Sequence, residues 1–205
     1  DRKELSAEAD NLRAGVDPEP PQPSHRDGAA RRDRPGAPLW RVVDFRRDVG
    51  APARAGYEAA LQASGLLDAW LSPDGQITIG ADGDLHLDIR WIKHGNNGLG
   101  AVLTPAIDPA DSMASELSPE IVARALGAIG AKADDGLCWV APDGHWRNGP
   151  ARGAWKKAAA EYLGAGARAA ARQARLDAIA ERLRVIAGET AGLGGVIAGI
   201  DAAIA

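Results

Sequence analysis

The sequence has very little cysteine, since Cys138 is the only one among its 205 residues. A single cysteine excludes a disulfide framework, and a reducing cytosol is the expected compartment. No amino-terminal apolar segment has the pattern of a signal peptide, and no run of eighteen apolar residues predicts a membrane span. We therefore expect a cytoplasmic protein with no membrane partner.

Motifs for nucleotide chemistry are also missing. The sequence contains no GxxxxGK[ST] phosphate-binding loop. Residues 94–100 are rich in glycine, but they lack both the GxGxxG spacing and a final Lys-Ser/Thr pair, so they predict a flexible connection. We expect a chain that is not an enzyme and holds no cofactor.

Metal-ligand spacing is absent as well. The histidines and the cysteine that could bind a metal are His86, His94, His145 and Cys138. No pair among them has a CxxC or HxxxH spacing, and Cys138 beside Trp139 is typical of a small buried hydrophobe rather than a nucleophile. An acidic cluster is formed by Asp74, Asp82, Asp84 and Asp88. Asp74 and Asp82 lie in predicted turns, where an aspartate side chain commonly bonds its own main chain. We therefore expect no metal site.

The formal net charge is −4, so the overall charge of the chain does not predict nucleic-acid binding. The charges are, however, unevenly distributed along the sequence. Residues 26–54 hold eight arginines against four aspartates, and residues 152–184 hold eight Lys or Arg against three acids. These basic segments predict contact with the phosphates of double-stranded DNA. The predicted contact residues are Lys156, Lys157, Arg168, Arg172 and Arg175. A solvated coiled-coil surface would explain the same charges.

Six tryptophans stand against two tyrosines and one phenylalanine, and five of the six lie between Trp40 and Trp146. We therefore predict a compact Trp-rich α+β domain at residues 39–150, built from helices and antiparallel hairpins. Its expected helices are residues 52–64 and 118–129. Its expected strands are residues 39–45, 67–71, 76–79, 84–91, 101–103, 137–140 and 145–147.

Two segments of this domain match at an offset of 69 residues: residues 70–80 and 139–149 each run from a tryptophan through a Pro-Asp-Gly turn to a glycine. Either a favoured turn recurs by chance or a helix-plus-hairpin unit is duplicated.

Helical patterns lie at both ends of the chain. Residues 1–16 predict an entering helix with a heptad seam formed by Leu5, Ala9, Leu12 and Val16. Residues 17–38, rich in proline and then in arginine, predict an extended linker. Residues 151–205 predict a long leaving helix. Its heptad seam ends with Leu193, Ile197, Ile200 and Ile204.

The entering seam and the end of the leaving seam have the same spacing when they are read in opposite directions. An antiparallel coiled coil that pairs Leu5 with Ile204 and Val16 with Leu193 would bury both stripes. It would also support the end of the leaving helix, where each interior glycine costs about 1 kcal/mol. The predicted architecture is thus an α+β domain at the tip of an antiparallel coiled coil.

Two stretches of the sequence, residues 36–45 (GAPLWRVVDF) and 59–75 (AALQASGLLDAWLSPDG), resemble the middle of large bacterial SMC-like (SbcC/MukB-like) coiled-coil ATPases. Some of those proteins belong to Wadjet-type plasmid-defence systems. The resemblance implies a fragment of a longer protein whose ATPase motifs lie elsewhere. It also implies a non-catalytic, hinge-like dimerisation module of a chromosome- or plasmid-handling complex.

The partners implied are a second copy of the chain, other subunits of the complex and double-stranded DNA. An alternative left open by the residues themselves is a winged-helix-like DNA-binding module, in which the helix-plus-hairpin units read DNA and the coiled coil serves as a strut.

Overall fold

A computed structural model describes residues 2–22, 24, 29, 31–75, 98–133 and 136–204. The strands predicted at residues 76–79 and 84–91 lie outside the described residues, as does most of the glycine-rich loop. The described chain mixes α-helices with small antiparallel sheets, so it belongs to the α+β class. It divides into two units, one formed by residues 1–18 and 169–205 and the other by residues 19–168.

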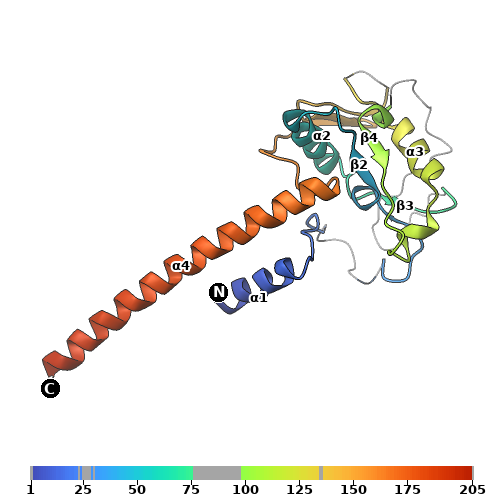
Figure 1. Ribbon diagram of the computed structural model, residues 1–205. Helices are drawn as coiled ribbons and strands as arrows, with labels where there is room; N and C mark the ends of the chain where they lie inside the picture. Colours follow the sequence, from blue (N-terminus) through green and yellow to red (C-terminus); the bar gives the residue numbers. More distant parts are fainter. Residues whose placement is uncertain are drawn as a thin grey trace. The chain divides into compact units, whose positions relative to one another are not determined.

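The first unit is helical. It contains α1 (Arg2–Arg13) and the greater part of α4 (Ala165–Ile204) (Figure 1). Ala9 and Leu12 of α1 are buried together with Ile179 of α4. The partly buried residues around this cluster are Leu5, Leu176 and Leu183. The predicted heptad stripe therefore forms an apolar contact between the two helices.

Ion pairs accompany this contact. The guanidinium group of Arg175 donates two hydrogen bonds to the carboxylate of Glu8, at 2.6 and 2.8 Å. Arg172 pairs with Asp17. Glu8 pairs with Arg175, and the later residue Asp17 pairs with the earlier residue Arg172, so the two segments run antiparallel.

The predicted register, however, is wrong. Leu12 and Leu5 belong to the cluster that contains Leu176, Ile179 and Leu183. Neither Ile197 nor Ile204 is part of it. Val16 is exposed. The remaining members of the predicted seam are exposed too: Leu193, Ile197, Ile200 and Ile204. The observed pairing uses the glycine-free part of the helix, where packing need not offset the cost of interior glycines. There the arginines also reach Asp17 and Glu8.

This register can be tested by crosslinking in a chain whose Cys138 has been replaced by serine. Cysteines at Leu12 and Leu176 should form an intramolecular disulfide under mild oxidation. In the shared cluster, Leu5, Ala9 and Leu12 match Leu183, Ile179 and Leu176 in spacing when the helices run antiparallel. Cysteines at Leu12 and Ile197 should not. Mass spectrometry of a protease digest distinguishes the two outcomes, and the opposite result would restore the register predicted from spacing.

The second unit contains α2 (Ala51–Ala63) and α3 (Pro119–Ala128), in agreement with the predicted helices to within a residue or two. Proline opens both helices, and the hydroxyl of Ser118 caps α3 by accepting a hydrogen bond from the N–H of Ile121 at 3.3 Å. Within the unit, α3 lies next to β4 (Leu103–Pro105) (Figure 1).

The strands form three small antiparallel sheets. They pair as β1 (Ala37–Pro38) with β3 (Trp70–Leu71), β2 (Val43–Phe45) with β4, and β5 (Cys138–Val140) with β6 (His145–Asn148) and β7 (Ala151–Ala154). Side chains from the sheets and both helices fill one core. Its largest fully buried members include Leu39, Leu61, Leu71, Leu103 and Leu126.

The predicted strand at residues 39–45 is half wrong, because Leu39–Arg41 forms a 3₁₀ turn and only β2 is extended. The N–H groups of Leu39 and Trp40 donate to carbonyls in the loop before β3, at 2.9 and 3.0 Å. Both side chains are buried. The turn therefore places two consecutive apolar side chains in the core, whereas a strand sends neighbours to opposite faces.

The predicted start of the leaving helix is also wrong. Residues 151–154 are strand β7, residues 155–164 are not helical, and α4 begins at Ala165. Strand β7 continues the β5–β6 hairpin through a turn at Gly149 and Pro150, and Gly149 has a φ of +60°, which favours glycine. Sheet pairing therefore overrides the alanine-rich composition of this segment.

The second half of the predicted linker belongs to the folded unit. The guanidinium of Arg31 donates to Oδ1 and the main-chain carbonyl of Asp68, at 2.9 and 2.8 Å, and stacks over the ring of Trp70. At Gly36, with a φ of +111°, a Cβ atom would lie 2.0 Å from the carbonyl oxygen of Leu71. The folded unit therefore begins before residue 39 and includes residues 31–38.

The two Pro-Asp-Gly turns share one geometry. The N–H of Gly75 donates to the carbonyl of Ser72, and the N–H of Gly144 donates to that of Ala141, each at 3.1 Å. Both glycines have a positive φ. This similarity is compatible with duplication and with recurrence of a favoured turn, because the residues that follow the first turn lie outside the described residues.

Candidate functional site

A fully buried carboxylate lies where the folded domain leads into α4. Glu58, on α2, accepts hydrogen bonds from the successive main-chain N–H groups of Glu161, Tyr162 and Leu163, at 2.7, 2.9 and 2.8 Å. Its Oε1 also accepts a bond from Nζ of Lys157 at 2.7 Å. Three consecutive N–H groups around one anion form a backbone nest, and the ammonium group balances the charge. This arrangement fixes residues 157–163 to α2.

Lys157 is fully engaged in that arrangement. Its side chain is 7% exposed, and Nζ bonds the carboxylates of Glu58 and Glu161 and the amide oxygen of Gln62. The ammonium also lies 4.3 Å from the centre of the Tyr162 ring. An ammonium group has three protons, and these three acceptors use them all. The prediction that Lys157 contacts DNA phosphate is therefore wrong.

The other predicted DNA-contacting residues do not form one surface on which each cation is free. Arg175 pairs with Glu8 of α1, and Arg172 pairs with Asp17 in the segment after α1. Arg168 donates a bond to the main-chain carbonyl of Tyr162 at 3.1 Å. Lys156 is exposed. Acidic partners within the chain thus offset part of the positive charge that residues 152–184 carry.

A different basic surface lies on the outer face of the β5–β6–β7 sheet. Trp139, Arg147 and Arg152 lie opposite one another across the three strands, so they occupy one row on one face. Arg152 is exposed, whereas Arg147 is half-buried and Trp139 is buried. The other face contributes Val140 and Trp146 to the core. The sequence does not reveal this row, because its pattern predicts a helix where β7 lies.

An exposed tryptophan and an exposed lysine follow strand β7. Trp155, which follows β7, is 43% exposed, and its N–H donates to the carbonyl of Gly144 at 3.0 Å. Lys156 beside it is exposed. An exposed tryptophan beside an exposed lysine is typical of an interaction surface for a protein or a nucleic acid.

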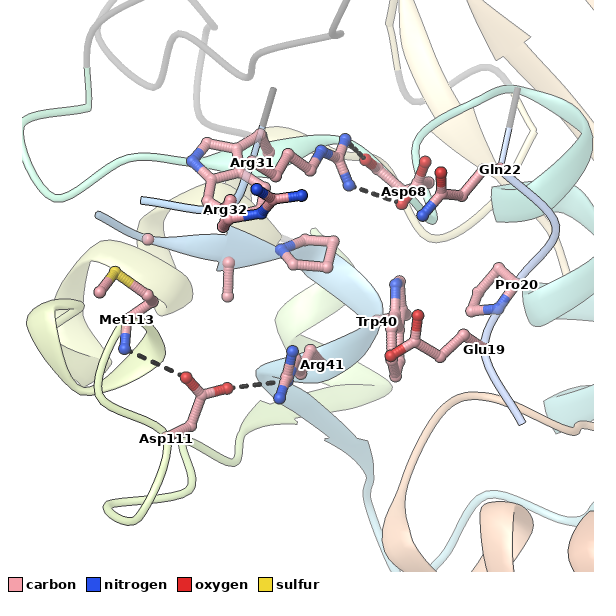
Figure 2. Close-up of a pocket in the computed structure, with 14 residues that line it drawn as sticks. Glu19, Pro20, Gln22, Arg31, Arg32, Trp40, Arg41, Asp68, Asp111 and Met113 are labelled. Atoms are coloured by element: carbon pink, nitrogen blue, oxygen red, sulfur yellow. Dashed lines mark hydrogen bonds and ion pairs between the residues drawn. The ribbon is translucent and has the colours of Figure 1, made fainter. Parts of the chain in front are cut away.

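A cavity of about 350 Å³ lies at the entrance of the chain into the domain (Figure 2). Figure 2 shows Asp111 between Arg41 and Met113, and Arg31 beside Asp68. Three arginines and three acidic residues line the cavity, so it has no charge preference for an anion. We assign its charged pairs a structural role in holding residues 31–41 to the domain.

The described residues contain little reactive chemistry. Burial raises the pKa of the Cys138 thiol to about 11, so the thiolate that a nucleophile requires is scarce at neutral pH. Among the described residues, no group of three or more histidine, cysteine or acidic side chains could hold a metal ion. His86, His94 and three of the clustered aspartates lie outside the described residues.

The α4 helix has an apolar surface without a described partner. It includes an eighteen-residue window with a mean hydropathy of 1.3, none of which is buried. Its length and composition alone are those of a helix that can cross a membrane. Glu189 and Asp201 interrupt the apolar composition, and the seam of heptads explains the same residues as a coiled-coil surface.

Neither a protein-family model nor a curated protein matches this chain. A search of solved structures finds similarity to the SMC hinge domain of Geobacillus stearothermophilus, crystallised as an asymmetric dimer. The TM-score is 0.34 and the sequence identity is 13%, over 97% of this chain and 88% of that chain. The α+β class rests on the helices and sheets described above.

Proposed function

We propose that the chain is a non-catalytic dimerisation module within a coiled-coil protein. The observation that carries the proposal is the antiparallel packing of α1 against α4, with Ala9, Leu12 and Ile179 buried between them. A folded α+β unit occupies the sequence between these two helices. A chain that leaves and returns along one coiled coil is suited to joining two such arms through the unit between them.

The finer proposal is that this module is the hinge-like part of an SMC-like ATPase that handles chromosomes or plasmids, including the plasmid-defence type. Its support is the resemblance of residues 36–45 and 59–75 to the middle of such proteins. It implies a cytoplasmic complex with further subunits, in keeping with the lone cysteine. The ATPase activity would belong to other parts of the protein.

Analytical ultracentrifugation of the 205-residue chain tests this function. We expect a dimer at tens of micromolar, at both 50 and 500 mM salt, because an interface between folded domains does not depend on counterion release. A monomer under both conditions would overturn the proposal.

A second candidate is the DNA-binding module with a coiled-coil strut, which the outer face of the β5–β6–β7 sheet favours. The residues that would bind phosphates there are Arg147, Arg152 and Lys156. Sedimentation of the chain in the presence of duplex DNA tests this candidate. A DNA-binding module predicts binding that weakens steeply between 50 and 200 mM salt, because each neutralised phosphate releases counterions. Binding that is absent at 50 mM salt would exclude this candidate.

A further inference from the structure

Strand β7 forms an outer edge of its sheet. It pairs with β6 on one side, and three of its four residues are exposed. On the other side, the main-chain groups of Arg152 and Ala154 make no hydrogen bond with any described residue. Such an edge is a template for a further strand.

The register of the sheet decides which main-chain groups of β7 point outward. The N–H of Ala141 donates to the carbonyl of His145, so the main-chain groups of odd-numbered residues in β6 face β5. Those of Trp146 and Asn148 therefore face β7, where their partners are Gly153 and Ala151. It follows that the N–H and C=O groups of Arg152 and Ala154 face away from the sheet.

We propose that this edge pairs with β7 of a second copy, so that two three-stranded sheets join into one. This inference rests on the proposed dimerisation and assigns its surface. In an antiparallel arrangement around a two-fold axis, Arg152 lies opposite Ala154 of the second copy, and Gly153 lies opposite its own equivalent. Both outward-facing pairs then exchange their N–H···O bonds.

The side chains of β7 suit this self-pairing. Each Arg152 faces an alanine rather than the arginine of the other copy, which avoids a direct like-charge pair. Gly153 lies at the axis, where it presents no side chain, and the ring of Trp146 of the same copy covers it. Trp155, 43% exposed, lies opposite Ala151 of the second copy and gains an apolar neighbour.

A second copy fits this edge better than an unrelated strand does. The pairing is isologous: one four-residue segment supplies both sides of the interface, as two-fold dimers require. The small residues Ala151, Gly153 and Ala154 also allow close approach of two identical edges. The basic outer face remains open on either side of the joined strands.

Cysteine pairs test the register directly in a chain with Cys138 replaced by serine. A chain carrying Arg152→Cys, mixed with one carrying Ala154→Cys, should form an intermolecular disulfide, because directly opposed Cα atoms lie about 5.5 Å apart. Either chain alone should not, since identical positions are offset by two residues and lie more than about 7 Å apart. Arg147→Cys on the middle strand, mixed with Ala154→Cys, is the matched control and should not crosslink.

A proline variant tests whether the edge holds the dimer together. Ala154→Pro removes an outward N–H and leaves the inward bonds of Gly153 in place, so the hairpin should persist by circular dichroism. We expect dimer dissociation to increase at least tenfold.

The outcomes separate the two proposals. A dimer that is unaffected by Ala154→Pro, with no disulfide in the mixed sample, would overturn the β7 interface while dimerisation stands. A monomeric parent chain would overturn dimerisation itself. If the proline variant fails to fold, the crosslinking result alone decides.

Discussion

Replacing Glu58 by alanine is expected to lower the free energy of unfolding by about 3–5 kcal/mol. The substitution removes a fully buried carboxylate that accepts three main-chain N–H groups and pairs with Lys157. The three N–H groups would then lack their acceptor in the core, and Lys157 would lose its buried counter-charge while keeping Glu161 and Gln62. Urea unfolding followed by circular dichroism measures the change.

Glu161→Ala is the matched control, because that carboxylate also pairs with Lys157 at 2.7 Å but is 46% exposed. Its loss should cost less than about 1 kcal/mol, as is usual for pairs in contact with water. If both variants lose the same stability, the buried carboxylate does not act as the anchor of residues 157–163.

Replacing Gly56 by alanine is expected to destabilise the domain by about 1–3 kcal/mol, although alanine is the better helix former. A Cβ atom at Gly56 would lie 1.7 Å from the carbonyl oxygen of Pro142. The obstacle is main chain in the turn between β5 and β6, so α2 and the sheet would have to separate. Thermal unfolding measures the effect.

Gly188→Ala in α4 is the matched control, because a Cβ atom there meets nothing within 4 Å. It should raise helix stability by roughly 0.5–1 kcal/mol through the lower entropy of the unfolded chain. Equal and favourable effects at both positions would show that α2 and the turn do not approach closely.

Local chemistry, read from the sequence alone, determined much of this fold. Proline near the start of α2 and α3, and Ser118 as a cap, act within one turn of chain, so the helices were predictable to within a residue or two. The Pro-Asp-Gly turns were equally predictable, because they need only a positive φ at glycine. The heptad spacing revealed that α1 and α4 would meet, since a stripe on each helix needs a partner.

Tertiary structure decided what depends on groups far apart in the sequence. Identical spacing permits many registers, and the observed one was selected where Glu8 meets Arg175 and the helix lacks glycine. A count of positive charges placed Lys157 on a basic surface, but Glu58, 99 residues earlier, draws it into the core. Strand β7 had no signal of its own, because Ala-Arg-Gly-Ala has little strand propensity and becomes a strand through pairing with β6. Local propensity therefore decides short elements, whereas pairing over long distances decides the register, the charges that stay exposed and the edge that we assign to the dimer.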